Sequence, residues 1–191
     1  MSLIPAFRIG VWNAWIFMSV FLIQMLIIML ANRQISEKSH VPREFKRNKR
    51  ERFMASAANL MWLAAMFYSI FLPFRLGTMW FYAGLAFFAI GLILLVLSTI
   101  NFISTPSDEV IKQGIYRFSR HPMYLAIFFI CLGAGTASAS WLFLLISVIM
   151  ALSFYREAHL EEKYCHETYG HDYQEYLNKT PKLFGLPKKL K

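Results

Sequence analysis

Cysteine and acidic residues are scarce in this sequence. The 191 residues include two cysteines, Cys131 in an apolar run and Cys165 in a polar one, and 11 acidic against 20 basic residues. Two cysteines so placed exclude a disulfide framework. The sequence also lacks a strand, glycine loop and helix in succession, which excludes a Rossmann nucleotide-binding domain.

Apolar residues are in excess, at 57% of the chain. A soluble domain is about 45–50% apolar, and in this chain the excess is gathered into long runs. We therefore predict an all-α, polytopic membrane protein in which residues 1–191 form a single domain.

The apolar runs predict five transmembrane helices. A helix needs about 20 apolar residues to cross about 30 Å of hydrocarbon, and the runs 11–31, 54–73 and 79–103 meet this length. A fourth run, 122–155, is too long for one span and contains small residues from Gly133 to Ser140. It therefore predicts a helical hairpin, which either spans the bilayer fully or turns within it. Its glycines fit a turn and close helix packing equally well.

The basic residues predict the orientation. Of the 20, all but Arg8 and Arg75 lie between the first two runs, after the third, or in the C-terminal tail. Because positive residues prefer the cytoplasm, we predict an N-terminus outside and a cytosolic C-terminus. The first run is too long for the apolar part of a cleavable signal. The basic segment 36–52 is predicted to lie at the headgroup interface.

The net charge of +9 allows an anionic partner. The bases flank apolar runs, and the sequence contains no base-stacking module or zinc-finger spacing. We therefore predict membrane lipids as the partner, and no nucleic acid.

Two polar segments, 101–124 and 156–184, bracket the hairpin and can meet because it returns the chain. In the first, Pro122 suits the first position of a helix, which makes His121 the N-cap, beside amide donors that favour an anionic group. Equally, Arg120 and His121 can simply anchor the helix at the headgroups.

In the second segment, Glu157 and Glu161 lie on one helical face beside an anionic leaflet. They indicate a cationic ligand or, alternatively, pairing with Arg156 and Lys163. His159, Glu162 and His166 have a metal-compatible spacing, but a solvated face explains them better, and we predict no metal.

Gly170 suits the end of that helix. A new amphipathic helix is expected to follow it. Tyrosines recur at helical spacing around this helix stop, and we expect them to pack against the membrane face. They are Tyr169, Tyr173 and Tyr176.

Taken together, these segments resemble the isoprenylcysteine carboxyl methyltransferase family, which is related to phospholipid methyltransferases. The resemblance covers about residues 101–184. The motifs that carry it are Gly114-Ile115-Tyr116, Arg120-His121-Pro122 with Tyr124, Glu161-Glu162, Tyr169-Gly170, Tyr173, Tyr176 and Pro181.

The resemblance implies S-adenosylmethionine as cofactor, released as S-adenosylhomocysteine, and a multi-pass membrane protein with its active site facing the cytosol. It also implies a cofactor-binding set and a catalytic pair that meets the substrate. The cofactor-binding set is Asn101, Glu109, Val110, Ile111, Tyr116, Arg120, His121, Pro122, Met123, Tyr124, Glu161 and Glu162. The catalytic pair is Arg156 and Glu157.

The expected reaction is in-line methyl transfer to the carboxylate of a lipidated, prenylcysteine-like acceptor. A carboxylate is already ionised at pH 7, so the transfer needs no general base. The first alternative is a phospholipid N-methyltransferase, whose amine acceptor must lose a proton to a base such as His121 or Glu157. The others are a nicotinamide-dependent sterol-type reductase, which shares the spaced tyrosines, and a non-catalytic membrane scaffold.

Overall fold

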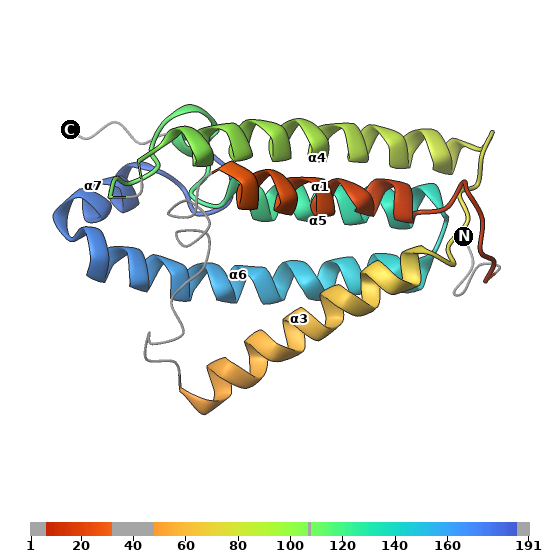
Figure 1. The fold of residues 1–191 in the computed structure, drawn as a ribbon, viewed down its shortest axis with the longest axis horizontal. Coiled ribbons are helices and arrows are strands. Elements are labelled where there is room, and N and C mark those ends of the chain that lie inside the picture. Colours follow the sequence, from red (N-terminus) through yellow and green to blue (C-terminus); the bar gives the residue numbers. More distant parts are fainter. Residues whose placement is uncertain (1–6, 32–47, 107, 187–191) are drawn as a thin grey trace.

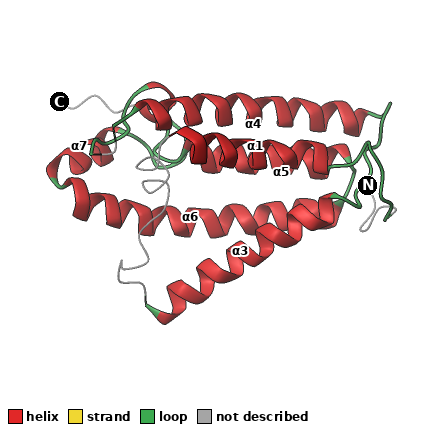
Figure 2. Cartoon of the chain, in the orientation of Figure 1, coloured by secondary structure: helices red, strands yellow, loops and turns green. Residues whose placement is uncertain are grey.

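The computed structural model describes residues 7–31, 48–106 and 108–186, and confirms the all-helical prediction (Figures 1 and 2). Within these residues, extended pairing is limited to one bridge between Asn13 and Pro73. The elements are α1 (Trp15–Ala31), α3 (Lys49–Ser69), α4 (Met79–Ser104), the short 3₁₀ helix η1 (Gly114–Arg117), α5 (Pro122–Ala137), α6 (Trp141–Tyr169) and α7 (His171–Lys179).

Local capping decides where several helices begin. The Thr78 side chain caps α4, and that of Ser140 caps α6. Asn48 and Glu51 form a reciprocal capping box at the start of α3, which satisfies amide donors that lack helical partners. The helix on which the predicted span 54–73 falls therefore begins before residue 54 and runs from Lys49 to Ser69. Of the basic segment 36–52, residues 36–47 lie outside the described part of the chain, and the rest begins α3.

The first helix begins four residues later than the predicted start at residue 11. The side-chain amide of Asn13 donates to the carbonyls of Arg8 and Ile70, each at 2.7 Å. These bonds hold the chain in a non-helical conformation against the segment that follows α3. Tertiary contacts therefore set this boundary.

The predicted hairpin is confirmed as α5, a three-residue turn and α6. The turn lies at residues 138–140, where Ala139 has a positive φ of 52°. Gly133 lies within α5, and a Cβ on it would come 2.7 Å from the Gly84 carbonyl oxygen of α4. Close packing, rather than the turn, therefore explains this glycine.

Two helices, α4 and α6, are long and apolar enough to cross a membrane, while α1 and α5 are shorter apolar helices of 17 and 16 residues. The 29 residues of α6 span roughly 43 Å at 1.5 Å per residue, more than the hydrocarbon thickness. Its apolar part ends at Tyr155 and the polar turns from Arg156 continue beyond it. Five spans and their orientation remain predictions.

The two polar segments meet at one end of the bundle (Figure 1). The loop after α4, the start of α5, the end of α6 and α7 gather there, opposite the α5–α6 turn. This confirms that the hairpin brings residues 101–124 and 156–184 together.

Candidate active site

His121 lies at the centre of this end of the molecule, as the N-cap of α5 with Pro122 in the first turn. Its backbone amide donates to the Ser119 hydroxyl at 3.1 Å, and its side chain is buried. The predicted N-cap position and the role of Pro122 are confirmed. The ring does not cap its own helix but reaches toward α6.

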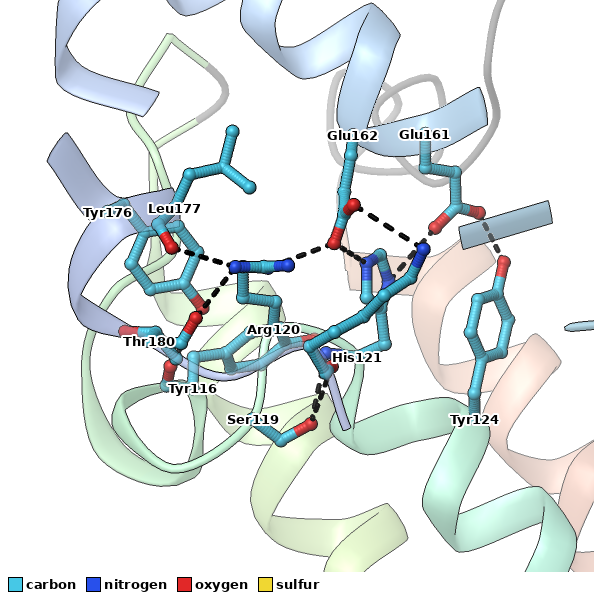
Figure 3. Close-up of polar contacts among 11 residues, drawn as sticks. Tyr116, Ser119, Arg120, His121, Tyr124, Glu161, Glu162, Tyr176, Leu177 and Thr180 are labelled. Carbon is cyan, nitrogen blue, oxygen red and sulfur yellow. Dashed lines mark hydrogen bonds and ion pairs between the residues drawn. The ribbon is translucent and has the colours of Figure 1, made fainter. Parts of the chain in front are cut away.

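Glu161 and Glu162 of α6 hold the His121 ring from two sides (Figure 3). Consecutive helical residues point about 100° apart, so one carboxylate reaches each nitrogen. Nδ1 lies 3.4 Å from Oε2 of Glu161, and Nε2 lies 3.2 Å from Oε1 of Glu162. Burial lowers the pKa of His121, but the hydrogen bonds and charges of the two carboxylates outweigh it, and the pKa is raised.

Arg120 joins three parts of the chain. Its Nε donates to Oε1 of Glu162 at 2.9 Å, while Nη1 donates to the carbonyls of Leu177 and Thr180 at 2.8 and 2.7 Å (Figure 3). A cation is favoured at a helix C-terminus, where carbonyls lack partners. Arg120 therefore caps the end of α7 while it pairs with α6.

Three basic side chains, those of Arg120, His121 and Lys182, contact the Glu162 carboxylate. Lys182 Nζ lies 3.5 Å from its Oε2, in addition to the contacts from Arg120 and His121. Burial raises the pKa of Glu162, but His121, Arg120 and Lys182 together lower it to about 2. The carboxylate is therefore ionised at any physiological pH.

Tyr124 links His121 to the apolar part of α6. Its hydroxyl donates to Glu161 Oε1, and its ring stacks on those of His121 and Phe154, with centroid distances of 5.5 and 5.1 Å. Glu161 is the more open of the two carboxylates, at 33% side-chain exposure against 10% for Glu162.

A second cluster supports the loop after α4. Tyr173 and Tyr176 of α7 are buried against Val110, and the Tyr176 hydroxyl donates to the Tyr116 carbonyl at 2.7 Å. Burial raises the pKa of the Tyr116 phenol. The prediction that these α7 tyrosines pack against the membrane face is therefore wrong, because they bind α7 to the loop.

Asn101 and Gly114 close this loop. The Asn101 Oδ1 accepts a hydrogen bond from the Ile115 amide at 3.1 Å. Gly114 has a φ of +56°, and a Cβ on it would lie 2.1 Å from that oxygen. Both residues thus hold η1 against the end of α4.

The remaining predicted residues are spread around these clusters. Glu109 is exposed and Ile111 half-buried in the loop beside Val110, and Met123 is half-buried in the first turn of α5. The predicted catalytic pair, Arg156 and Glu157, lies about one turn before Glu161 on α6, next to the end of its apolar part.

Four contributors were not among the predicted site residues: Ser119, Leu177, Thr180 and Lys182. Lys182 was counted only as one basic residue of the tail, and no motif marked it out. In the described ranges no group of three or more His, Cys, Asp or Glu residues could hold a metal ion. The expected absence of a metal stays a prediction.

The fold and the cluster define a membrane-associated helical protein with a charged site at one end of its bundle. The family model described as phospholipid methyltransferase matches residues 79–172, from the start of α4 to the start of α7. The chain is also 37% identical, over 83 residues, to the Protein-S-isoprenylcysteine O-methyltransferase of Saccharomyces cerevisiae. That match covers 42% of this chain and 34% of the yeast protein, so it spans about a third of the relative's length.

These matches confirm the resemblance found in the sequence: the chain resembles the isoprenylcysteine carboxyl methyltransferases and their phospholipid methyltransferase relatives. The matched residues include His121, Glu161 and Glu162, whose contacts join the two halves of the site.

Proposed function

We propose that this protein transfers a methyl group from S-adenosylmethionine to the carboxylate of a lipidated, prenylcysteine-like acceptor at the cytosolic membrane face. The observation that carries the proposal is the His121 ring held between Glu161 and Glu162 at the start of α5. It lies within a segment that matches a methyltransferase family.

The chemistry of the donor set fits the cofactor. S-adenosylmethionine supplies an electrophilic methyl group on a sulfonium cation and carries an ammonium, a carboxylate and ribose hydroxyls. Glu161, the more open carboxylate, suits the ammonium or the hydroxyls. The first turn of α5, where Met123 follows Pro122 and its N–H is a free helical donor position, suits the carboxylate. Tyr124, which is stacked between His121 and Phe154, adds an aromatic face.

In this proposal Arg156 orients the acceptor carboxylate, with Glu157 one turn from Glu161 on the same face. The acceptor's charge and the cofactor's charge disappear together as the methyl group moves, so a dry site favours the reaction. The aromatic stack beside His121 helps to exclude water. Positioning supplies much of the remaining rate.

The test is a methyl-transfer assay with labelled cofactor, against a farnesylated N-acetylcysteine and a panel of aminophospholipids. We expect His121→Ala and Glu161→Ala to lower kcat/KM by roughly a hundredfold, comparable to the loss of one preorganised polar contact. His159→Ala and Glu167→Ala, on the exposed polar face of α6, are matched controls with near-normal rates.

A second readout separates loss of cofactor binding from unfolding of the His121 variant. His121→Gln keeps a hydrogen-bonding side chain, and the rise in Tm on adding the cofactor measures binding to the folded protein. Normal turnover and a normal thermal shift in both alanine variants would remove this site from the proposal.

A phospholipid N-methyltransferase is the second candidate, because the family model that matches is described by that activity. It requires a base to deprotonate the amine. His121 suits this role poorly, since both ring nitrogens already face carboxylates that favour its protonated form. Methylation of aminophospholipids but not of the prenylated acceptor would favour this second function. A thermal shift with NADPH but not with S-adenosylmethionine would instead favour a reductase.

A further inference from the structure

The chain that follows α7 returns to the start of α5 and is held there. The Arg120 amide donates to the Pro181 carbonyl at 3.0 Å, and the Gly185 amide donates to the Phe118 carbonyl at 3.1 Å. Between these bonds, the Ser119 hydroxyl donates to the Lys182 carbonyl at 3.4 Å. Residues 181–185 therefore form a strap across residues 118–120, with Lys182 at a fixed place on it.

This strap places the Lys182 ammonium at the border between apolar surface and polar site. Nζ lies 4.5 Å from the ring centroid of Tyr155 and 3.5 Å from Glu162 Oε2. Tyr155 ends the apolar part of α6 and is 49% exposed, and Leu152, one turn earlier, is also exposed. An acceptor whose lipid chain lies along this part of α6 would present its headgroup near Lys182.

The other cations around Glu162 leave Lys182 able to bind a second anion. Glu162 is already bound at shorter distance by Arg120 and His121, at 2.9 and 3.2 Å. An ammonium has three N–H donors, and within the described residues Lys182 contacts one carboxylate oxygen and the face of one ring. A second anion can therefore be bound without removing Glu162 from its other partners.

We propose that Lys182 is a specificity-determining residue that binds the anionic headgroup of the acceptor and disfavours cationic amine acceptors. This inference rests on the proposed methyl transfer and adds to it the residue that selects a carboxylate. Lys182 contacts the ring of Tyr155, the chain neighbour of Arg156, and in this proposal both cations act on the same headgroup. Like charges repel at close range, so the same ammonium opposes a protonated aminolipid.

The test compares Lys182→Met with Lys182→Arg and the wild type. Methionine keeps the length and apolar stem without the charge, and arginine keeps the charge. The probes are a farnesylated N-acetylcysteine as substrate and its carboxamide as inhibitor. Lys179→Met is the matched control, because Lys179 pairs with Glu175 on the exposed side of α7.

We expect Lys182→Met to raise KM for the carboxylate acceptor about tenfold, the order of a lost charged contact, and to leave KM for S-adenosylmethionine unchanged. The wild type and Lys182→Arg should bind the carboxylate more tightly than the carboxamide, whereas in Lys182→Met this preference should fall about tenfold, to the part that Arg156 supplies. A purely structural lysine would weaken both ligands together.

The outcomes separate this inference from the proposed function. An active wild type whose carboxylate preference is undiminished in Lys182→Met overturns the role of Lys182 alone, as does equal weakening of both ligands. A wild type that methylates no prenylated acceptor overturns the proposed function and the role of Lys182 with it.

Discussion

Arg120 and Glu162 lie 42 positions apart in the sequence and form a 2.9 Å ion pair in which both side chains are about nine-tenths buried. The same guanidinium caps α7 through the Leu177 and Thr180 carbonyls. One side chain therefore fixes the start of α5, the polar end of α6 and the end of α7 relative to one another. The position of His121 between the two glutamates depends on this arrangement.

We predict that Arg120→Ala destabilises this end of the protein by about 3 kcal/mol, because it leaves a buried carboxylate and two helix-terminal carbonyls without their cation. The measurement is thermal unfolding in detergent, combined with limited proteolysis after α7. Lys179→Ala, which removes a surface pair with Glu175, is the control and should change Tm little. Equal effects of the two substitutions would show that Arg120 does not hold these helices together.

The His121 and Glu162 pair predicts a pH window of maximum stability. The folded-state pKa of His121 is raised above 6.5, so its contribution to stability is complete below pH 6.5 and is lost as the pH rises through the raised value. The pKa of Glu162 is lowered from 4.5 to about 2, so its contribution to stability is complete above pH 4.5 and is lost as the pH falls toward 2. Both contributions are complete between pH 4.5 and 6.5.

Thermal unfolding of the wild type and of His121→Gln across pH 4 to 9 checks this window. Glutamine does not titrate, so the fall in Tm above pH 6.5 should be smaller in the variant. Parallel profiles above pH 6.5 would mean that His121 is not the titrating group.

Part of this site followed from the sequence. Arg120-His121-Pro122 predicted the helix start, and the long apolar run predicted the hairpin that brings His121 to Glu161 and Glu162. Both are local signals: proline favours the first helical turn, and run length limits the number of spans.

Other features depend on contacts that sequence spacing does not encode. Arg120 caps α7 through backbone carbonyls, which any residue can supply, so positions 177 and 180 carried no signal. Asn13 looked like one polar residue within a span, but its bond to the Ile70 carbonyl makes the helix begin only after it. The Asn48–Glu51 capping box was readable in principle, but counting apolar residues alone overlooked it.

Gly114 and Gly170 offer a matched test of the loop that carries Tyr116. Both have a φ of +56°, but a Cβ on Gly170 meets nothing within 4 Å, whereas one on Gly114 would come 2.1 Å from Asn101 Oδ1. Gly170→Ala should therefore cost only the backbone strain of its φ of 56° and ψ of −124°, about 1–3 kcal/mol. Gly114→Ala should cost more, about 3 kcal/mol or above, since overpacking adds to that strain.

The Gly114 substitution should also affect the site. Displacement of the Asn101 side chain breaks its hydrogen bond with the Ile115 amide, which frees η1 and the Tyr116 carbonyl that Tyr176 binds. We expect Gly114→Ala to reduce the rise in Tm on adding S-adenosylmethionine and Gly170→Ala to retain it, at temperatures where both are folded. Equal losses of stability in the two variants, with equal responses to the cofactor, would show that the Asn101 contact does not hold the loop in place.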